Sequence, residues 1–108
     1  QYTADHLTRI AGLAMWASYS AADLSAAPLA AISIYGSLDA GAGRITAPET
    51  RAGLPASTAY IEVPGGNHEQ MGWYTGQPND PRATIARADQ QHQVAQATIA
   101  MLAGLTAP

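Results

Sequence analysis

Three segments of the chain are apolar runs of strand length. Gly12–Tyr19 and Ala31–Tyr35 contain no charged residue, as expected for strands that are covered by helices on both faces. Thr58–Val63 is the third run, and Glu62 indicates that one position near its end reaches solvent. The hydrophobic pattern therefore predicts three buried strands. Met15, Trp16 and Tyr19 in the first run are expected in the core.

A short helix is predicted between the second and third runs. Thr46 and Glu49 form a T-x-x-E capping box, in which the side chains satisfy free backbone N–H groups at the start of a helix. Pro48 stands in the first turn, and Gly53 followed by Pro55 supplies the stop. This connection is therefore expected to be a helical crossover.

The pattern changes to a helical period over Ala86–Leu105. Apolar residues recur there at near-helical spacing, namely Val94, Ala97, Ile99, Met101, Leu102 and Leu105. Polar residues are expected on the opposite face, namely Gln90, Gln91, His92, Gln93 and Gln96. Asp89 in the first turn and Gly104 near the exit suit the helix dipole and a C-terminal cap. We expect an amphipathic helix that lies on the sheet.

Alternating strands and helices are typical of an α/β fold, here a three-stranded parallel sheet with flanking helices. In such sheets, functional residues gather at the carboxyl ends of the strands. Asp39 follows the second predicted strand in YGSLDA, and His68 follows the third in PGGNHEQ. Both are therefore predicted on one rim, with Gly65 and Gly66 allowing the backbone to turn and aim the histidine ring over it.

A carboxylate beside a histidine fixes its tautomer and stabilises the imidazolium, so Asp39 and His68 are candidates for acid–base chemistry. The alternative is that Asp39 caps a turn and His68 lies on the surface. HEQMG, from His68 to Gly72, begins like the zinc motif H-E-x-x-H but has glycine where the second histidine is required. No metal and no cofactor are expected.

Composition excludes several classes of function. The chain has 108 residues, one domain at most, and 47% of them are hydrophobic. A net charge of -3, with five Arg and no Lys, offers no basic patch for nucleic acid. No window approaches the roughly 20 apolar residues of a membrane span and no signal-peptide pattern is present, so a soluble chain without a membrane partner is expected. The absence of Cys excludes thiolate catalysis and leaves the compartment open.

The motifs together resemble the carboxyl half of an α/β hydrolase, with Y-G-S-L-D after one buried strand and G-G-N-H after the next. Residues 65–91, GGNHEQMGWYTGQPNDPRATIARADQQ, are similar to the bacterial branch near the dienelactone-hydrolase-like enzymes. The resemblance covers essentially the whole chain. It implies a triad in the chain order Ser, Asp, His, with Asp39 as acid and His68 as base, acting on carboxylic esters or lactones.

The nucleophile that the resemblance implies is not found in the chain. It should stand before Asp39 in a G-x-S-x-G turn, yet no serine has glycine two residues before and two after it. We therefore expect residues 1–108 to be a single partial domain, whose N-terminal half with the nucleophile is missing. Ser37 and Ser18 are the alternative nucleophiles within the chain.

Three side chains after His68 are candidates for a substrate pocket, namely Met71, Trp73 and Tyr74, and packing of the loop is their alternative role. Asp80 and Arg82 are expected to form an ion pair that holds this loop.

Two classes of function remain open. In the first, the chain is part of a serine hydrolase. In the second, it is a non-catalytic fragment or remnant that self-associates. The first strand, Gly12–Tyr19, would pair with the missing half, so its edge is expected to be bare and apolar. The sequence therefore predicts a homodimer, or pairing with an N-terminal half, through this edge.

Overall fold

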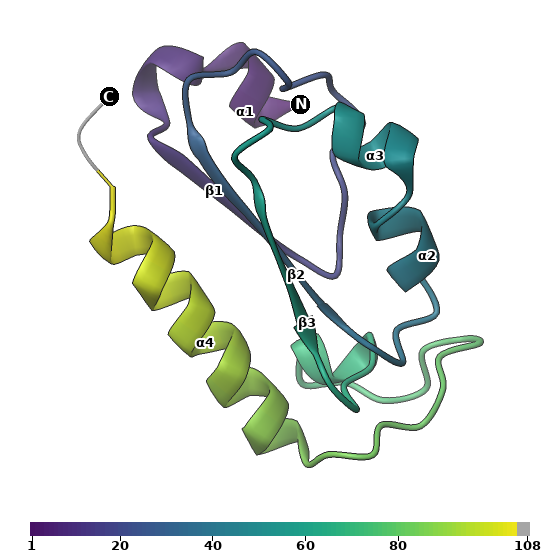
Figure 1. Ribbon diagram of the computed structural model, residues 1–108. Coiled ribbons are helices and arrows are strands. Elements are labelled where there is room, and N and C mark those ends of the chain that lie inside the picture. The colour runs from purple at the N-terminus through teal and green to yellow at the C-terminus, as the bar shows by residue number, and fades with distance from the viewer. Residues whose placement is uncertain (106–108) are drawn as a thin grey trace.

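The computed structural model describes residues 1–105. Figure 1 shows a sheet between two layers of helices, and the chain runs through nine elements within these residues. These elements are α1 (Tyr2–Asp5), the 3-10 helix η1 (Leu7–Arg9), β1 (Gly12–Trp16), β2 (Ala30–Gly36), α2 (Ala42–Ile45), α3 (Pro48–Ala52), β3 (Ala59–Val63), the 3-10 helix η2 (Glu69–Met71) and α4 (Arg87–Ala103).

The three strands form one parallel sheet in the order β1-β2-β3. Ser33 on the central strand lies opposite Met15 on one side and Tyr60 on the other. The predicted α/β fold with three parallel strands is therefore confirmed. The first strand is shorter than predicted and ends at Trp16, because Ala17 adopts a left-handed φ of 47° that turns the chain out of the sheet.

The two faces of the sheet bury separate apolar clusters. Helix α4 covers one face, and the other is covered by α1, α3 and the loop that joins β1 to β2 (Figure 1). The α4 side is built around Ile32, Ile34, Val63 and Val94. The opposite side is built around Met15, Leu24 and Leu54. Burial on both faces explains why the strands carry continuous apolar runs rather than alternating ones.

The predicted capping box is wrong. The residue before α3 is Ala47, which makes no side-chain capping bond, while the Thr46 hydroxyl donates to the Ala42 carbonyl oxygen and ends α2. Pro48 disfavours a helical conformation in the residue before it, so Ala47 is extended and separates two helices. Pro48 in the first turn and Gly53 at the C-cap are confirmed.

Helix α4 forms as predicted, with Asp89 in its first turn and Gly104 at its C-cap. Its buried face differs from the prediction in three residues. Ile99 and Leu102 are exposed, whereas Gln90 is completely buried. The helix face that packs on the sheet is therefore narrower than the face that the apolar residues of the sequence would define. Among residues 1–105, no helix combines the length and apolar character needed to span a bilayer.

Candidate functional site

Asp39 and His68 are hydrogen bonded to each other at the carboxyl ends of β2 and β3. His68 Nδ1 lies 3.0 Å from Asp39 Oδ2. An ionised carboxylate only accepts hydrogen bonds, so the proton of this bond belongs to Nδ1, and in the neutral imidazole the lone pair then lies on Nε2. The His68 side chain is 33% exposed, while the Asp39 side chain is completely buried. The arrangement can take up a proton at Nε2 and stabilise the resulting imidazolium.

The Asp39 carboxylate is held on both of its oxygens. Oδ1 accepts the backbone N–H of Gly41 at 2.6 Å, which leaves Oδ2 for His68. The Asp39 N–H in turn donates to the Gly36 carbonyl oxygen at 3.1 Å. The turn after β2 therefore fixes the direction of the carboxylate by bonds that do not involve the histidine.

Two glycines allow the loops after β2 and β3 to approach each other closely. A Cβ placed on Gly36 would lie 2.3 Å from the Gly66 carbonyl oxygen, which is shorter than any real contact. This oxygen accepts the N–H of Leu38 at 2.9 Å. Gly65 has a φ of 77°, a left-handed conformation that glycine adopts readily. The glycine pair makes the sharp turn after β3, and the contact with Gly36 joins the two loops.

Asp80 fixes the backbone of His68 from the loop that follows η2. One carboxylate oxygen accepts the His68 N–H at 3.1 Å, and the other accepts the Glu69 N–H at 3.0 Å. Within residues 1–105, the predicted ion pair between Asp80 and Arg82 is not formed. Two adjacent N–H groups at the start of a 3-10 turn have no partner inside that turn, and Asp80 supplies one for each.

Behind His68, two buried amide side chains form a network. Gln90 and Asn67 are almost fully enclosed, and the carboxamide of Gln90 bonds to the main chain of Asn67. The prediction that Gln90 lies on the polar face of its helix is wrong, because this side chain is completely buried. Its spacing in the sequence could have indicated burial, because Gln90 precedes Val94, Ala97 and Met101 by four, seven and eleven residues. These positions share one helix face, and that face meets the sheet.

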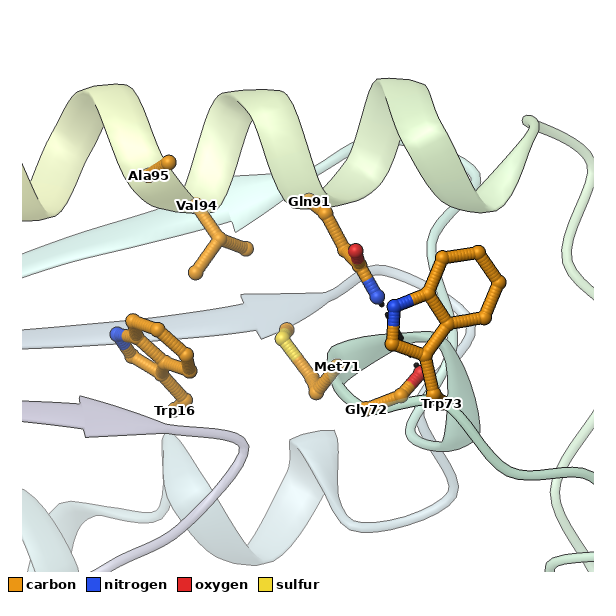
Figure 2. A pocket seen from close by; sticks show the side chains of 7 residues that line it. All are labelled: Trp16, Met71, Gly72, Trp73, Gln91, Val94 and Ala95. Atoms are coloured by element: carbon orange, nitrogen blue, oxygen red, sulfur yellow. Dashed lines mark hydrogen bonds between the residues drawn. The ribbon is translucent and has the colours of Figure 1, made fainter.

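An apolar cavity of about 320 Å³ lies between α4, the end of β1 and the loop after η2. Figure 2 shows the residues that line it, which are Trp16, Met71, Gly72, Trp73, Gln91, Val94 and Ala95. Two of the three pocket candidates, Met71 and Trp73, belong to this lining, and Tyr74 does not. Trp16 was expected in the core but is 47% exposed, with its indole N–H donated to Thr98 on α4. Tyr19 is equally exposed, so only Met15 of the three lies in the core.

Arg87 holds the loop after η2 against the start of α4. Its guanidinium donates to the carbonyl oxygens of Glu69, Gly72 and Tyr74. The same group lies 5.3 Å from the centre of the Trp73 ring. A planar guanidinium offers five N–H donors in a fixed arrangement, which suits a cluster of carbonyl oxygens. Arg87 thereby positions the side chains that close one end of the cavity.

The pKa of the Tyr74 phenol is raised. Tyr74 is 42% exposed, and its partial burial is the main cause. The carboxylates of Asp80, Glu69 and Asp39 raise the pKa further, while Arg87 lowers it. The phenol O–H donates to the side chain of Gln77. Three carboxylates therefore act on one phenol at this end of the sheet.

Neither alternative nucleophile is joined to His68. The Ser37 hydroxyl oxygen accepts the Gly65 N–H at 2.8 Å, and Ser18 is exposed beyond the end of β1. In the part of the chain that the structure describes, no serine hydroxyl is hydrogen bonded to His68. The same residues contain no group of three or more His, Cys, Asp or Glu side chains that is arranged to hold a metal ion.

Comparison with known protein families gives a match over most of the chain. Residues 1–92 match the model of the alpha/beta hydrolase family, and this range includes both Asp39 and His68. Searches of the curated proteins and of the solved structures find no match.

Proposed function

The chain belongs to the alpha/beta hydrolase family, and from this premise we propose that Asp39 and His68 are the acid and base of a serine-hydrolase triad. The family supports a hydrolase-type function. The observation that carries the proposal is the 3.0 Å bond between a buried carboxylate and a partly exposed imidazole. The substrates are carboxylic esters or lactones, as in the dienelactone-hydrolase-like branch that the sequence of residues 65–91 resembles.

In this mechanism, His68 Nε2 takes the proton of the serine hydroxyl while the serine oxygen bonds to the acyl carbon. Asp39 stabilises the imidazolium that forms. His68 then gives the proton to the leaving alcohol as the ester bond breaks, which produces an acyl-serine. In the second half of the reaction, His68 takes a proton from a water molecule as the water oxygen bonds to the acyl carbon. The acyl–serine bond then breaks, His68 returns the proton to the serine oxygen, and the carboxylic acid is released.

We propose that the serine comes from another segment that pairs with the free edge of β1. The Ala11 carbonyl oxygen accepts the Ala30 N–H, and the Ala17 N–H donates to the Ile34 carbonyl oxygen. The main-chain groups of every second residue of this strand therefore bond to β2. Residues in parallel strands alternate in direction, and the N–H and C=O groups of Gly12, Ala14 and Trp16 therefore face away from β2. A parallel strand on this edge would end at the rim that carries His68. Residues 1–108 would then form part of a larger domain.

The cavity beside Trp16 supports a substrate pocket on the same side. Met71 and Trp73 would contact the acyl group, since they follow His68 closely in the chain and line an apolar space of about 320 Å³. Tyr74 lies outside that lining and has no contact role in the proposal.

The test uses a fluorophosphonate probe, which labels activated serines. The chain alone should remain unlabelled, and the chain joined to a segment that carries the G-x-S-x-G serine should be labelled and should hydrolyse a short aryl ester. His68→Ala should abolish both, while His92→Ala, an exposed position on α4, should leave both unchanged. Labelling of the chain alone that depends on His68 would identify an internal serine instead. Labelling and hydrolysis that survive His68→Ala would rule out its role as the base.

A second candidate function is non-catalytic self-association through the same edge. It is favoured by the outward N–H and C=O groups of β1 and by the half-exposed Trp16 at its end. A symmetric dimer would place two copies of β1 side by side in antiparallel orientation. Sedimentation velocity should show a dimer, and a single monomeric species at all concentrations would rule this candidate out.

A further inference from the structure

The carboxamide of Gln90 forms two hydrogen bonds with the main chain of Asn67, the residue that precedes His68. Its Oε1 accepts the Asn67 N–H at 3.1 Å, and its Nε2 donates to the Asn67 carbonyl oxygen at 2.7 Å. Both main-chain groups of one residue are thus bonded to one side chain, much as a neighbouring strand would bond them. Gln90 is 0% exposed and Asn67 is 2% exposed, so no water competes for these bonds.

These two hydrogen bonds require the Gln90 carboxamide to approach the main chain closely, and the glycine before Asn67 permits this. A Cβ on Gly66 would lie 2.7 Å from Gln90 Oε1, so any larger residue would displace the carboxamide. Gly66 is also the residue whose carbonyl oxygen joins the Asp39 loop through Leu38. One short stretch of backbone therefore connects Asp39, His68 and the first turn of α4.

Gln90 is anchored to the core of the molecule. It stands one helical turn before Val94, which packs with Ile32, Ile34 and Val63 of the sheet. The carboxamide is held further by Gln70, whose Nε2 donates to Gln90 Oε1 at 3.0 Å and also to the Ile85 carbonyl oxygen. A loop that follows a strand is otherwise free to move, and here it is tied to a helix that is packed on the sheet.

The side chain of Asn67 extends the same support to the other side of His68. Its Nδ2 donates to the Pro81 carbonyl oxygen, and its Oδ1 accepts the Gln70 N–H. Asp80 holds the His68 N–H itself. The backbone on both sides of the histidine is thus fixed, which fixes the direction in which its side chain leaves the chain.

We propose that Gln90 is the positioning residue for His68: it bonds to the main chain of Asn67 and so holds the imidazole in register with the Asp39 carboxylate. The role of the imidazole in hydrolysis rests on the function proposed above, while the positioning itself concerns the bond between His68 and Asp39. A misplacement of about 1 Å in a catalytic group is enough to cost roughly 100-fold in rate.

The experiment observes this bond directly in the chain as it stands. Nuclear magnetic resonance of protein with ¹⁵N-labelled histidine should show an exchange-protected Nδ1 proton, assigned to His68 by its loss in His68→Ala and in Asp39→Ala. Gln90→Met has nearly the same volume, no N–H donor and only a weakly accepting sulfur, and it should lose this signal while circular dichroism still shows a folded chain. Gln93→Met, an exposed position on the same helix, should keep it.

Two further variants separate positioning from stability. Val94→Ala weakens the core beside Gln90 without removing a bond to Asn67, and it should keep the His68 signal even though it unfolds earlier. Where Gln90→Met does not fold, Gln90→Asn withdraws the carboxamide by one methylene and should lose the signal in a folded chain. A protected proton in Gln90→Met or folded Gln90→Asn, or its equal loss in Val94→Ala, would overturn the proposal.

The outcomes for the two proposals are distinct. A chain that never supports hydrolysis but loses the His68 signal in Gln90→Met defeats the proposed function and keeps the positioning role. Hydrolysis that depends on His68 but is unchanged, together with the signal, in Gln90→Met defeats the positioning role and keeps the proposed function. In an active protein, Gln90→Met should lower kcat about 100-fold with little change in KM, because the reaction geometry is lost rather than substrate binding.

Discussion

The β2–β3 side of the sheet and the β1 side differ in how fully their hydrogen-bonding groups are paired. On the β2–β3 side, Asp39 bonds to His68 and Gly41, and Gly36 lies against Gly66. On the β1 side, alternate main-chain groups face outward, and Trp16 is half exposed beside an apolar cavity. The chain thus forms the Asp39–His68 hydrogen bond within itself, whereas the outward main-chain groups of β1 have no neighbouring strand among residues 1–105.

The close contact between the two loops should be the most sensitive point of the β2–β3 side. Gly36→Ala places a methyl group against the Gly66 backbone, where no side chain can move away. We expect the free energy of unfolding to fall by about 3 kcal/mol, as measured by urea denaturation. The matched control is Gly43→Ala in α2, where a Cβ meets nothing within 4 Å. The control should gain up to about 1 kcal/mol from helix propensity, and an equal response of both variants would contradict the assigned contact.

A substitution on the β1 side should change the association of the chain more than its free energy of unfolding. Trp16→Lys adds a charge at the free edge and removes one hydrogen bond to Thr98. The free energy of unfolding should change by only about 1 kcal/mol, while sedimentation velocity should show a shift from dimer to monomer. Ile99→Lys, at an exposed position on α4, should leave the association unchanged. A dimer that persists in Trp16→Lys would show that the edge is not the interface.

The smallest expected effect concerns the charge gathered at the rim. The raised pKa of Tyr74 means that the folded chain favours the neutral phenol. Its contribution to stability is present below the pKa of the unfolded state and is lost as pH rises through the folded pKa. Ultraviolet titration should show a tyrosine contribution at raised pH that disappears in Tyr74→Phe and moves to lower pH in Glu69→Gln. An unchanged titration in Glu69→Gln would contradict the influence of this carboxylate.

The fold and the proximity of Asp39 to His68 could be predicted from the sequence because both follow from the pattern of buried strands. Apolar runs without charge indicate strands buried on both faces, and the carboxyl ends of parallel strands meet at one edge. Two chemically suited side chains that follow neighbouring strands are thereby brought close, as the 3.0 Å bond shows. The family match over residues 1–92 supports the same fold.

Other features depend on neighbours that the local pattern does not reveal. Gln90 counts as polar in any hydropathy pattern, and its burial is favourable because its carboxamide bonds to Asn67, 23 residues earlier, and to Gln70. Thr46 fits a capping motif, but Pro48 separates it from the helix it was expected to cap. Trp16 is apolar and lies on a strand, and its exposure follows from the free edge of β1.

The proposed function requires that Asp39 act through His68 in the hydrolysis of an ester. The most direct measurement is kcat/KM for a short aryl ester with the chain joined to the segment proposed to supply the serine, comparing Asp39→Asn with Asp23→Asn at an exposed position. The Asp39→Asn substitution would keep the shape of the site and favour the wrong tautomer of His68, so we expect kcat/KM to fall about 10⁴-fold, with Asp23→Asn unchanged. A value for Asp39→Asn within a few-fold of the unsubstituted protein would contradict it.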